Sequence, residues 1–329
     1  MIIHMKTTNI PFMLVIYGPT GVGKTDFALS IAEHIPAEII NMDVGQFYAP
    51  LSIGTAKPDW KNSSVPHHFF DIIDTPIHYT VTEYRSLLYK TITEVRSRGR
   101  LPILVGGSGF YLHALLFPPQ AAIPEVDISS LYPIGINLWQ ELFKIDPQRA
   151  LRIDKADEYR IKRALTIWHA TGKLPSSYVP VYEPEADFMV IFLERDRQEL
   201  RERIAARVFE MFNQGWIEET QALENTAWQE FIQRKNLIGY NEIFEYLLTQ
   251  KTQEDFKSMA HKINIQTRQY AKRQHTFWRK LEREINKEKR YTGKYVGCLE
   301  TVNLTNLKIH LYINELLKRL YCKIGKKYE

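Results

Sequence analysis

The order of apolar and polar positions predicts strands and helices in alternation. Short apolar runs have the length and composition of buried strands at residues 12–17, 37–42, 101–105 and 187–193. Helical periodicity follows each of them, after residue 25 and at residues 81–98, 110–116 and after residue 196. Strands separated by amphipathic helices are typical of a parallel sheet flanked by helices, so we predict an α/β fold.

Two parts of the chain depart from this alternation. Four prolines and Gly135 interrupt residues 118–145, which predicts an insertion on the surface. The last third reads as helical, with helices at 218–223, 241–248 and 253 to about 285. Residues 290–329 look like an appended tail with one amphipathic helix at 307–320. We expect the boundaries to be a core with its first part at 1–117, an insertion at 118–145, the rest of the core with further helices at 146–285, and a basic tail at 286–329.

The strongest local motif is the glycine-rich stretch at residues 18–25. It fills every fixed position of the phosphate-binding template G-x-x-x-x-G-K-[ST], between an apolar strand and a helix. Its backbone N–H groups and the helix N-terminus favour an anion, Lys24 can reach phosphate oxygens, and Thr25 can ligate Mg²⁺. The alternative is a glycine-rich turn before a helix. We expect a P-loop, which does not choose between ATP and another diphosphate, formed by Gly18, Pro19, Thr20, Gly21, Val22, Gly23, Lys24 and Thr25.

Other candidate residues follow neighbouring strands. Asp43 comes directly after the run at 37–42, and Ser108 lies in a second glycine-rich turn after the strand at 101–105. Residues at the carboxyl ends of parallel strands face the ligand crevice of an open sheet. Asp43 could instead cap a turn. His67 and His68 are adjacent to aspartates, but neighbours on an extended segment point to opposite faces, so we expect structural hydrogen bonds there rather than a metal site.

Charge gathers on the predicted helix that begins at residue 253. Residues 253–290 contain eleven Lys or Arg against five Asp or Glu, and aromatic residues are interleaved with the basic ones. Such a pattern suits RNA phosphates and unstacked bases. An exposed basic helix with its aromatics in the core is the alternative. Arg160 and Arg163 share one side of another helix, and Arg203 and Arg207 form a basic row that is usually a solvated face but from which Arg207 could reach the phosphate site.

Composition narrows the class without deciding it. Apolar residues make up 44% and charged residues 25% of the 329 residues, with a net charge of +5 and a pI near 8.9. These are globular values with a mild preference for polyanions. No apolar run approaches the ~20 residues that span a bilayer, and residues 1–10 lack the layout of a cleavable signal. With only Cys298 and Cys322, we expect a reducing cytoplasm and no structural zinc.

In this order the motifs resemble the bacterial tRNA dimethylallyltransferases (isopentenyl-diphosphate:tRNA transferases). The likeness extends over roughly residues 14–279. Besides the P-loop and Asp43, its markers are the stretches 53–58 (IGTAKP), 105–108 (VGGS), 160–165 (RIKRAL), 239–242 (GYNE) and 267–274 (TRQYAKRQ).

The resemblance implies the chemistry. That family transfers a dimethylallyl group from dimethylallyl diphosphate to the exocyclic amine of adenine 37, beside the tRNA anticodon. Carried over, Asp43 is the base, Arg207 contacts the diphosphate, Ser108 retains a hydroxyl where Thr is usual, and Mg²⁺ is the cofactor. The expected tRNA contacts are Asp43, Val44, Gly45, Gln46, Tyr159, Arg160, Ile161, Lys162, Arg163, Gly239, Tyr240, Arg268, Lys272, Arg273 and Arg279. We expect a cytoplasmic monomer with no membrane contact.

Three departures from the family pattern stand out. Val44 replaces the usual Ser or Thr, so one hydrogen bond near the base is lost. The insertion is short and broken by Pro133 and Gly135, which changes the expected grip on the anticodon stem. The tail after residue 290 is longer than usual and has no zinc finger, and its role stays open.

Three other functions share part of this pattern. A small-molecule kinase shares the P-loop but needs an arginine-rich lid with a spacing that we do not find. An adenylate isopentenyltransferase acts on free AMP and has no need of Arg160, Arg163 or the basic helix. A non-catalytic RNA-binding protein does not need the Lys24, Thr25 and Asp43 set.

Overall fold

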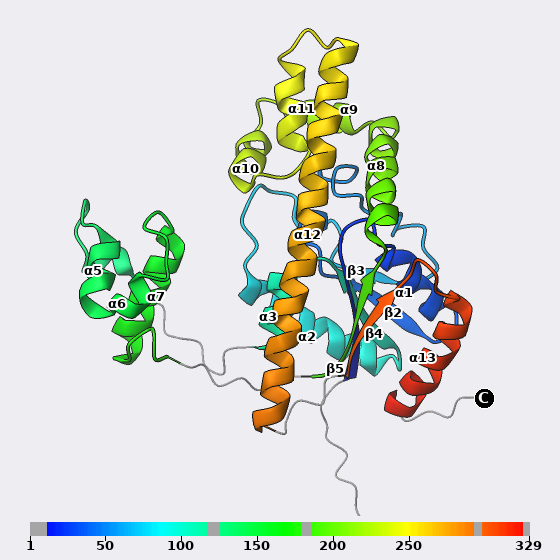
Figure 1. Cartoon of the computed structure of the whole chain (residues 1–329), viewed down its shortest axis with the longest axis horizontal. Coiled ribbons are helices and arrows are strands. Elements are labelled where there is room, and N and C mark those ends of the chain that lie inside the picture. The colour runs from blue at the N-terminus through cyan, green and yellow to red at the C-terminus, as the bar shows by residue number, and fades with distance from the viewer. Residues whose placement is uncertain (1–11, 118–125, 179–185, 293–297, 325–329) are drawn as a thin grey trace, which may run out of the picture. The chain divides into compact units, whose positions relative to one another are not determined.

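Six parallel strands form one sheet, in the order β3-β2-β4-β1-β5-β6 (Figure 1). This computed structural model describes residues 12–117, 126–178, 186–292 and 298–324. The strands are β1 Phe12–Tyr17, β2 Ala37–Asn41, β3 His67–His68, β4 Leu101–Gly106, β5 Asp187–Glu194 and β6 Cys298–Asn303. The four predicted strands are confirmed to within one residue. The P-loop strand β1 lies between β4 and β5, with Val15 opposite Leu104 and Val190.

Helices cover both faces of this sheet. On one face, α1 (Lys24–Ala32) packs beside α13 (Ile309–Ile324). On the other, α2 (Val81–Ser97) contacts α3 (Gly109–Leu116), and α3 contacts the 40-residue helix α12 (Gln253–Thr292). Beyond the carboxyl ends of the strands lie α8 Arg197–Asn213, α9 Trp216–Gln221, α10 Ala227–Lys235 and α11 Tyr240–Leu247. The sequence pattern did not predict α10.

Burial of β1 on both faces holds the P-loop strand in place. All six of its residues are buried. Leu14 and Ile16 belong to the apolar cluster shared with Phe27 of α1, whereas Tyr17 faces α12. There the ring of Trp278 stacks on Phe192 with centroids 4.9 Å apart. The strand before the P-loop and the long helix α12 therefore share one core, which places that helix beside the phosphate-binding loop.

The C-terminal segment is part of the sheet, contrary to the predicted appended tail. Strand β6 pairs with β5 along its whole length, from Cys298 opposite Met189 to Asn303 opposite Glu194. Helix α13 buries Ile313, Leu316, Leu317 and Leu320 in the cluster that contains α1. The pattern was misread because an edge strand is recognisable only with its partner, which is more than a hundred residues away in the chain.

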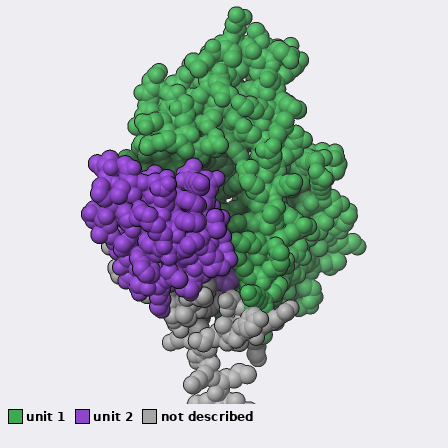
Figure 2. Space-filling model, turned by 60° about the vertical axis from the view of Figure 1, so that its left-hand side comes forward, with its two compact units in different colours: residues 1–116, 184–329 green, residues 117–183 purple. Residues whose placement is uncertain are grey.

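The inserted unit is longer than predicted. Residues 117–183 form a second compact unit, drawn purple in Figure 2, so residues 146–183 belong to it and not to the core. It contains α4 Ile128–Leu131, α5 Leu138–Ile145, α6 Pro147–Ala150 and α7 Glu158–Thr171. Leu142 of α5 packs with Ile161 and Leu165 of α7 in a core of its own. That shared core, which spans the predicted boundary, explains the difference.

The paired histidines serve the structure, as expected. His68 Nε2 lies 2.6 Å from a carboxylate oxygen of Glu38, and His67 Nδ1 lies 2.7 Å from the carbonyl of Val65. Arg98 also donates two hydrogen bonds to Glu38, at 2.8 and 2.7 Å. In the described residues, no group of three or more His, Cys, Asp or Glu side chains could hold a metal ion.

Candidate active site

The P-loop wraps around the ammonium group of Lys24. Gly23 precedes α1 with φ 104°, a left-handed conformation that favours glycine. Lys24 Nζ donates to the carbonyl oxygens of Gly18 and Pro19, both at 3.0 Å. Burial lowers the pKa of Lys24 to about 8, against the opposing effect of the Asp43 carboxylate. The cation is therefore poorly solvated, and no carboxylate of the described residues is in hydrogen-bond contact with it, which favours an anionic ligand.

Asp43 lies at the carboxyl end of β2, on the same edge of the sheet as the P-loop. Its Oδ1 accepts a hydrogen bond from the Gly45 N–H at 3.3 Å, so it caps the short 3₁₀ helix η1 (Val44–Phe47). Its own N–H donates to Oδ1 of the buried Asn41 at 2.8 Å. Burial raises the pKa of Asp43, while Lys24 and Arg207 oppose that rise. Capping and catalysis are compatible here, since one carboxylate oxygen is enough for the cap.

Helix α8 brings arginines to the P-loop. Arg207 NH1 lies 3.4 Å from the hydroxyl of Thr20, and Arg203 Nε donates to the carbonyl of Gly21 at 2.9 Å. Arg195, in the turn before the helix, donates to the carbonyl of Val22 at 2.8 Å. Burial lowers the pKa of Arg207, which keeps its charge because arginine titrates so high. The guanidinium groups of these three arginines therefore contact the P-loop. Arg195 and Arg203 were not among the predicted site residues.

Two cavities meet at Asp43. The first, here called the phosphate cavity, has a volume of about 640 Å³ and contains the P-loop residues Lys24 and Thr25. The second, the reaction cavity, has a volume of about 540 Å³ and is lined by Ser108, Trp216 and side chains of α12. Asp43 and Arg207 line both. Other residues common to the two are Thr20, Thr55, Ala56 and Met211.

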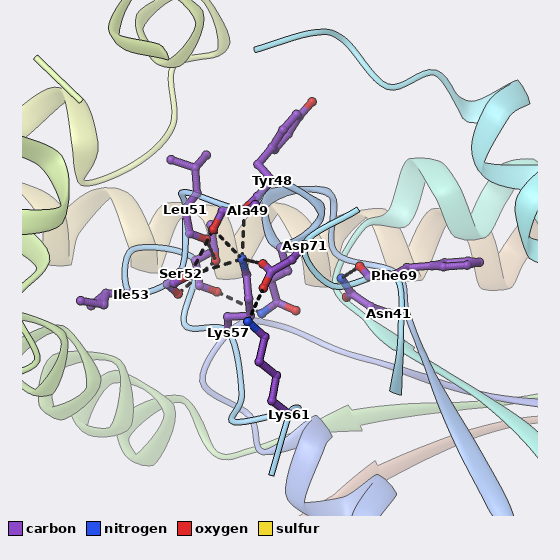
Figure 3. A network of polar contacts seen from close by, with 12 residues as sticks. Asn41, Tyr48, Ala49, Leu51, Ser52, Ile53, Lys57, Lys61, Phe69 and Asp71 are labelled. Atoms are coloured by element: carbon purple, nitrogen blue, oxygen red, sulfur yellow. Dashed lines mark hydrogen bonds and ion pairs between the residues drawn. The ribbon is translucent and has the colours of Figure 1, made fainter. Parts of the chain in front are cut away.

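A dense hydrogen-bond network shapes the loop at residues 52–58, which forms one wall of these cavities. Lys57 donates to the carbonyl of Tyr48 at 3.0 Å and forms an ion pair with Asp71 (Figure 3). On the other side of the loop, Glu219 of α9 accepts from the N–H groups of Ser52, Ile53 and Gly54 at 2.7 to 3.0 Å. The loop is therefore fixed on one side by Lys57 and its partners and on the other side by Glu219 of α9. These contacts also fix where the loop lies relative to Asp43.

Ser108 lines the reaction cavity, as its place in the second glycine-rich turn predicts. Next to it, Gly107 accepts a hydrogen bond from Nε2 of Gln274 at 2.9 Å. A Cβ at Gly107 would meet that nitrogen at 2.1 Å, so only glycine allows this approach. Gln274 was not among the predicted site residues. The sequence could have pointed to Gln274 through its position, because this polar residue falls on the buried stripe of α12 that also contains Ala271 and Trp278.

The basic residues of α12 divide between two faces. Arg273 lines the reaction cavity together with Gln266 and Tyr270, which precede it on the same face of the helix. Arg268, Lys272 and Arg279 instead line a separate cavity of about 730 Å³ between α12 and α8, here called the basic groove. The groove also contains Arg195, Arg197 and Arg201, against one carboxylate, that of Glu194. The helix therefore presents its charges to two different spaces, because its residues rotate by 100° each.

Other predicted RNA contacts differ in exposure. In the second unit Tyr159, Arg160 and Arg163 are exposed and Lys162 is half-buried, whereas Ile161 is only 3% exposed and belongs to the core. Gly239 is also buried, and a Cβ there would meet the ring of Trp216 at 2.0 Å. Tyr240 lines the reaction cavity with its hydroxyl 2.7 Å from Glu219. We therefore assign Ile161 and Gly239 to packing.

Two residues that line the reaction cavity from α10 and its C-cap were also absent from the predicted set. Lys235 and Asn236 line it from the end of α10, and Lys235 Nζ lies 2.6 Å from Nδ1 of His78. No signal in the sequence pointed to them, because α10 itself was not predicted. Among the described residues, no helix is both long enough and apolar enough to cross a membrane.

Known proteins that are similar to this chain in sequence and fold are named as transferases that act on tRNA. The family described as IPP transferase matches residues 46–281. The tRNA dimethylallyltransferase of Petrotoga mobilis is 40% identical over 279 residues, which cover 82% of this chain and 91% of that protein. A protein of the same name from Thermotoga neapolitana is 34% identical over 83% of this chain and 91% of its own. The tRNA isopentenylpyrophosphate transferase structure from Bacillus halodurans aligns over 96% of this chain and 97% of its own, with 28% identity and a TM-score of 0.65.

Proposed function

The chain belongs to the IPP transferase family, and on that basis we propose that it transfers a dimethylallyl group from dimethylallyl diphosphate to the exocyclic amine of adenine 37 in tRNA. One observation carries the proposal. The phosphate cavity, which contains the P-loop, and the reaction cavity, which is lined by aromatic side chains and by the basic helix α12, share one carboxylate, that of Asp43. One chain supplies the residues of both cavities, so we propose that the protein acts as a monomer. We propose that it acts in the cytoplasm, where its tRNA substrate is found.

The phosphate cavity is suited to a diphosphate leaving group. Breaking the allylic C–O bond leaves negative charge on the diphosphate and positive charge on carbon. Lys24 and Arg207 both line this cavity, so two positive charges lie close to where that negative charge would develop. The lowered pKa of Lys24 fits this role, because a bound diphosphate would supply negative charge to an ammonium group that burial has stripped of water.

Asp43 is suited to take the proton from the amine. An exocyclic adenine amine is a weak nucleophile, so a base must remove its proton as the new C–N bond forms. Burial raises the pKa of this carboxylate and makes it a stronger base than an exposed aspartate. The adenine must leave the anticodon stack to enter the reaction cavity, where Trp216 and Tyr270 provide aromatic walls.

We also propose that Mg²⁺ assists, with Thr25 as its protein ligand. Thr25 lines the phosphate cavity, and its hydroxyl is an oxygen ligand of the type that Mg²⁺ prefers, as are the oxygens of a diphosphate. When bound, the ion would neutralise charge on the leaving group. The residues therefore fit the ion through substrate oxygens rather than through a cluster of carboxylates.

The RNA is held, in this proposal, by charge outside the reaction cavity. In unit 1, Arg268, Lys272 and Arg279 of the basic groove would contact backbone phosphates, and in the second unit the exposed Arg160 and Arg163 would do the same. Arg273 lines the reaction cavity and would therefore contact the reacting base. Val44 lines the reaction cavity with an apolar side chain, which fits the loss of one hydrogen bond beside Asp43.

A transfer assay tests the proposal against its rivals. Labelled dimethylallyl diphosphate is incubated with the protein and Mg²⁺, and with tRNA, with AMP, or with a metabolite panel plus ATP. We expect label only in tRNA, and only in tRNA with adenine at position 37. Label in AMP would replace the proposal with an adenylate transferase, phosphorylation of a metabolite would replace it with a kinase, and tRNA binding without transfer would leave an RNA-binding protein.

A further inference from the structure

Gln274 is a buried polar residue of α12 that joins three segments of the site. Only 4% of it is exposed. Its Oε1 accepts a hydrogen bond from the Thr20 N–H of the P-loop at 2.9 Å, and its Nε2 donates to the Gly107 carbonyl at 2.9 Å. Its own backbone carbonyl accepts from the Tyr17 hydroxyl at 3.3 Å. Both ends of the side-chain amide are therefore used, each on the backbone of a different glycine-rich loop.

These contacts define the geometry of both cavities. Thr20 is also the residue whose hydroxyl lies 3.4 Å from Arg207 NH1, and Gly107 precedes Ser108. Thr20, Ser108 and Arg207 all line the reaction cavity, whereas Gln274 does not. One amide thus sets the spacing between the P-loop and the second glycine-rich loop, and it ties both to the helix that carries Arg273.

We propose that Gln274 is a positioning residue that holds the P-loop open in its anion-binding shape by bridging Thr20 and Gly107. The proposal rests on the diphosphate site of the proposed function but requires no transfer reaction. Removing this buried amide leaves the Thr20 N–H and the Gly107 carbonyl without their partner inside the protein, which is costly. A glutamine is suited to this bridge because its amide combines an acceptor and a donor at every pH.

The test measures binding of inorganic diphosphate by titration calorimetry, in the presence of Mg²⁺, to four proteins. They are wild type, Gln274→Met, Gln274→Glu and Tyr17→Phe. Gln274→Met keeps the volume and removes both bonds of the amide, so we expect the Kd for diphosphate to rise roughly tenfold. Tyr17→Phe is the matched control, because it removes the third hydrogen bond to the same residue and leaves the amide untouched. We expect its Kd to equal that of wild type.

Gln274→Glu supplies a second readout that general packing would not change. Its carboxylate keeps the acceptor for the Thr20 N–H but loses the donor to Gly107, and protonation restores that donor. The weakening relative to wild type should therefore be larger at pH 8 than at pH 6. If Gln274→Met binds like wild type, or if both it and Tyr17→Phe weaken binding equally, the proposal is wrong. Absence of dimethylallyl transfer by wild type would instead overturn the proposed function and leave this result unaffected.

Discussion

The guanidinium group of Arg207 lies 3.4 Å from the hydroxyl of Thr20, so helix α8 contacts the P-loop across 187 residues of sequence. The same arginine and the same threonine line both the phosphate cavity and the reaction cavity. This contact places a permanent positive charge where a leaving diphosphate would meet the reacting carbon. In the proposed reaction this charge would stabilise the leaving diphosphate without a rearrangement of solvent.

Lys24→Ala should cut transfer severely while the protein remains folded. Lys24, the first residue of α1, supplies charge rather than packing, so we expect kcat/KM to fall on the order of 10²-fold or more, as for the loss of one preorganised donor. Steady-state kinetics with dimethylallyl diphosphate and a thermal unfolding curve check both parts. Unchanged kinetics would contradict the assignment of the P-loop to the diphosphate.

The same lysine predicts a pH dependence of diphosphate binding. Because its pKa in the free protein is about 8, the ammonium is present below that pH and is lost as the pH rises through it. Affinity for dimethylallyl diphosphate should therefore decline above pH 8 in the wild type. Lys24→Ala should lack this decline, and calorimetric titrations at pH 7 and pH 9 make the comparison.

Asp43→Asn should remove basicity and retain the local fold. An asparagine Oδ1 can still accept from the Gly45 N–H, so the cap of η1 is kept. We expect kcat to fall on the order of 10²-fold or more with tRNA affinity near normal. Single-turnover assays and RNA binding measure the two effects separately. A collapse of tRNA affinity instead would show that Asp43 acts only as a structural cap.

Lys272 and Arg273 are neighbours in sequence that face different spaces, so their variants should differ. Lys272→Gln, in the basic groove, should lower the slope of log K against log salt for tRNA by roughly 0.7–0.9 with KM for dimethylallyl diphosphate unchanged. Arg273→Gln, in the reaction cavity, should reduce transfer as well. Titrations with tRNA at several salt concentrations test the pair. A wild-type salt slope for Lys272→Gln would remove the basic groove from the RNA interface.

The C-terminal helix should contribute to global stability. Leu316 of α13 is fully buried, and Leu316→Ala should lower the free energy of unfolding by about 2–5 kcal/mol. Leu311→Ala on the same helix is the control, since Leu311 is 52% exposed and its loss should cost less than about 0.5 kcal/mol. Urea unfolding measures both. Equal stabilities would mean that α13 does not pack on the core.

Glu38 should make stability sensitive to acid. Hydrogen bonds from Arg98 and His68 lower the pKa of this carboxyl below its unfolded value. Its contribution is therefore complete above the unfolded pKa and is lost as the pH falls through the lower folded value. Glu38→Gln should be less stable than wild type at pH 7, and the difference should narrow between pH 5 and pH 3. A difference that stays constant over this range in urea unfolding would contradict this assignment.

Local pattern was sufficient for everything that depends on near neighbours in the chain. The P-loop between β1 and α1, the position of Asp43 after β2 and the existence of the long basic helix α12 all follow from short-range spacing, turn chemistry and periodicity. Four of the six strands were placed to within one residue for the same reason, because a buried parallel strand is a short continuous apolar run.

Tertiary structure decided what depends on distant partners. Strand β6 forms because its backbone pairs with the edge of β5, and no periodicity within residues 298–303 predicts that pairing. The face of α12 that meets the reaction cavity, and so the separation of Arg273 from Lys272, depends on how the stripe containing Trp278 packs on Phe192. Gln274 became visible as part of the site only when Thr20 and Gly107 were placed on either side of its amide, since hydrogen bonds between residues up to 254 positions apart leave no local signal.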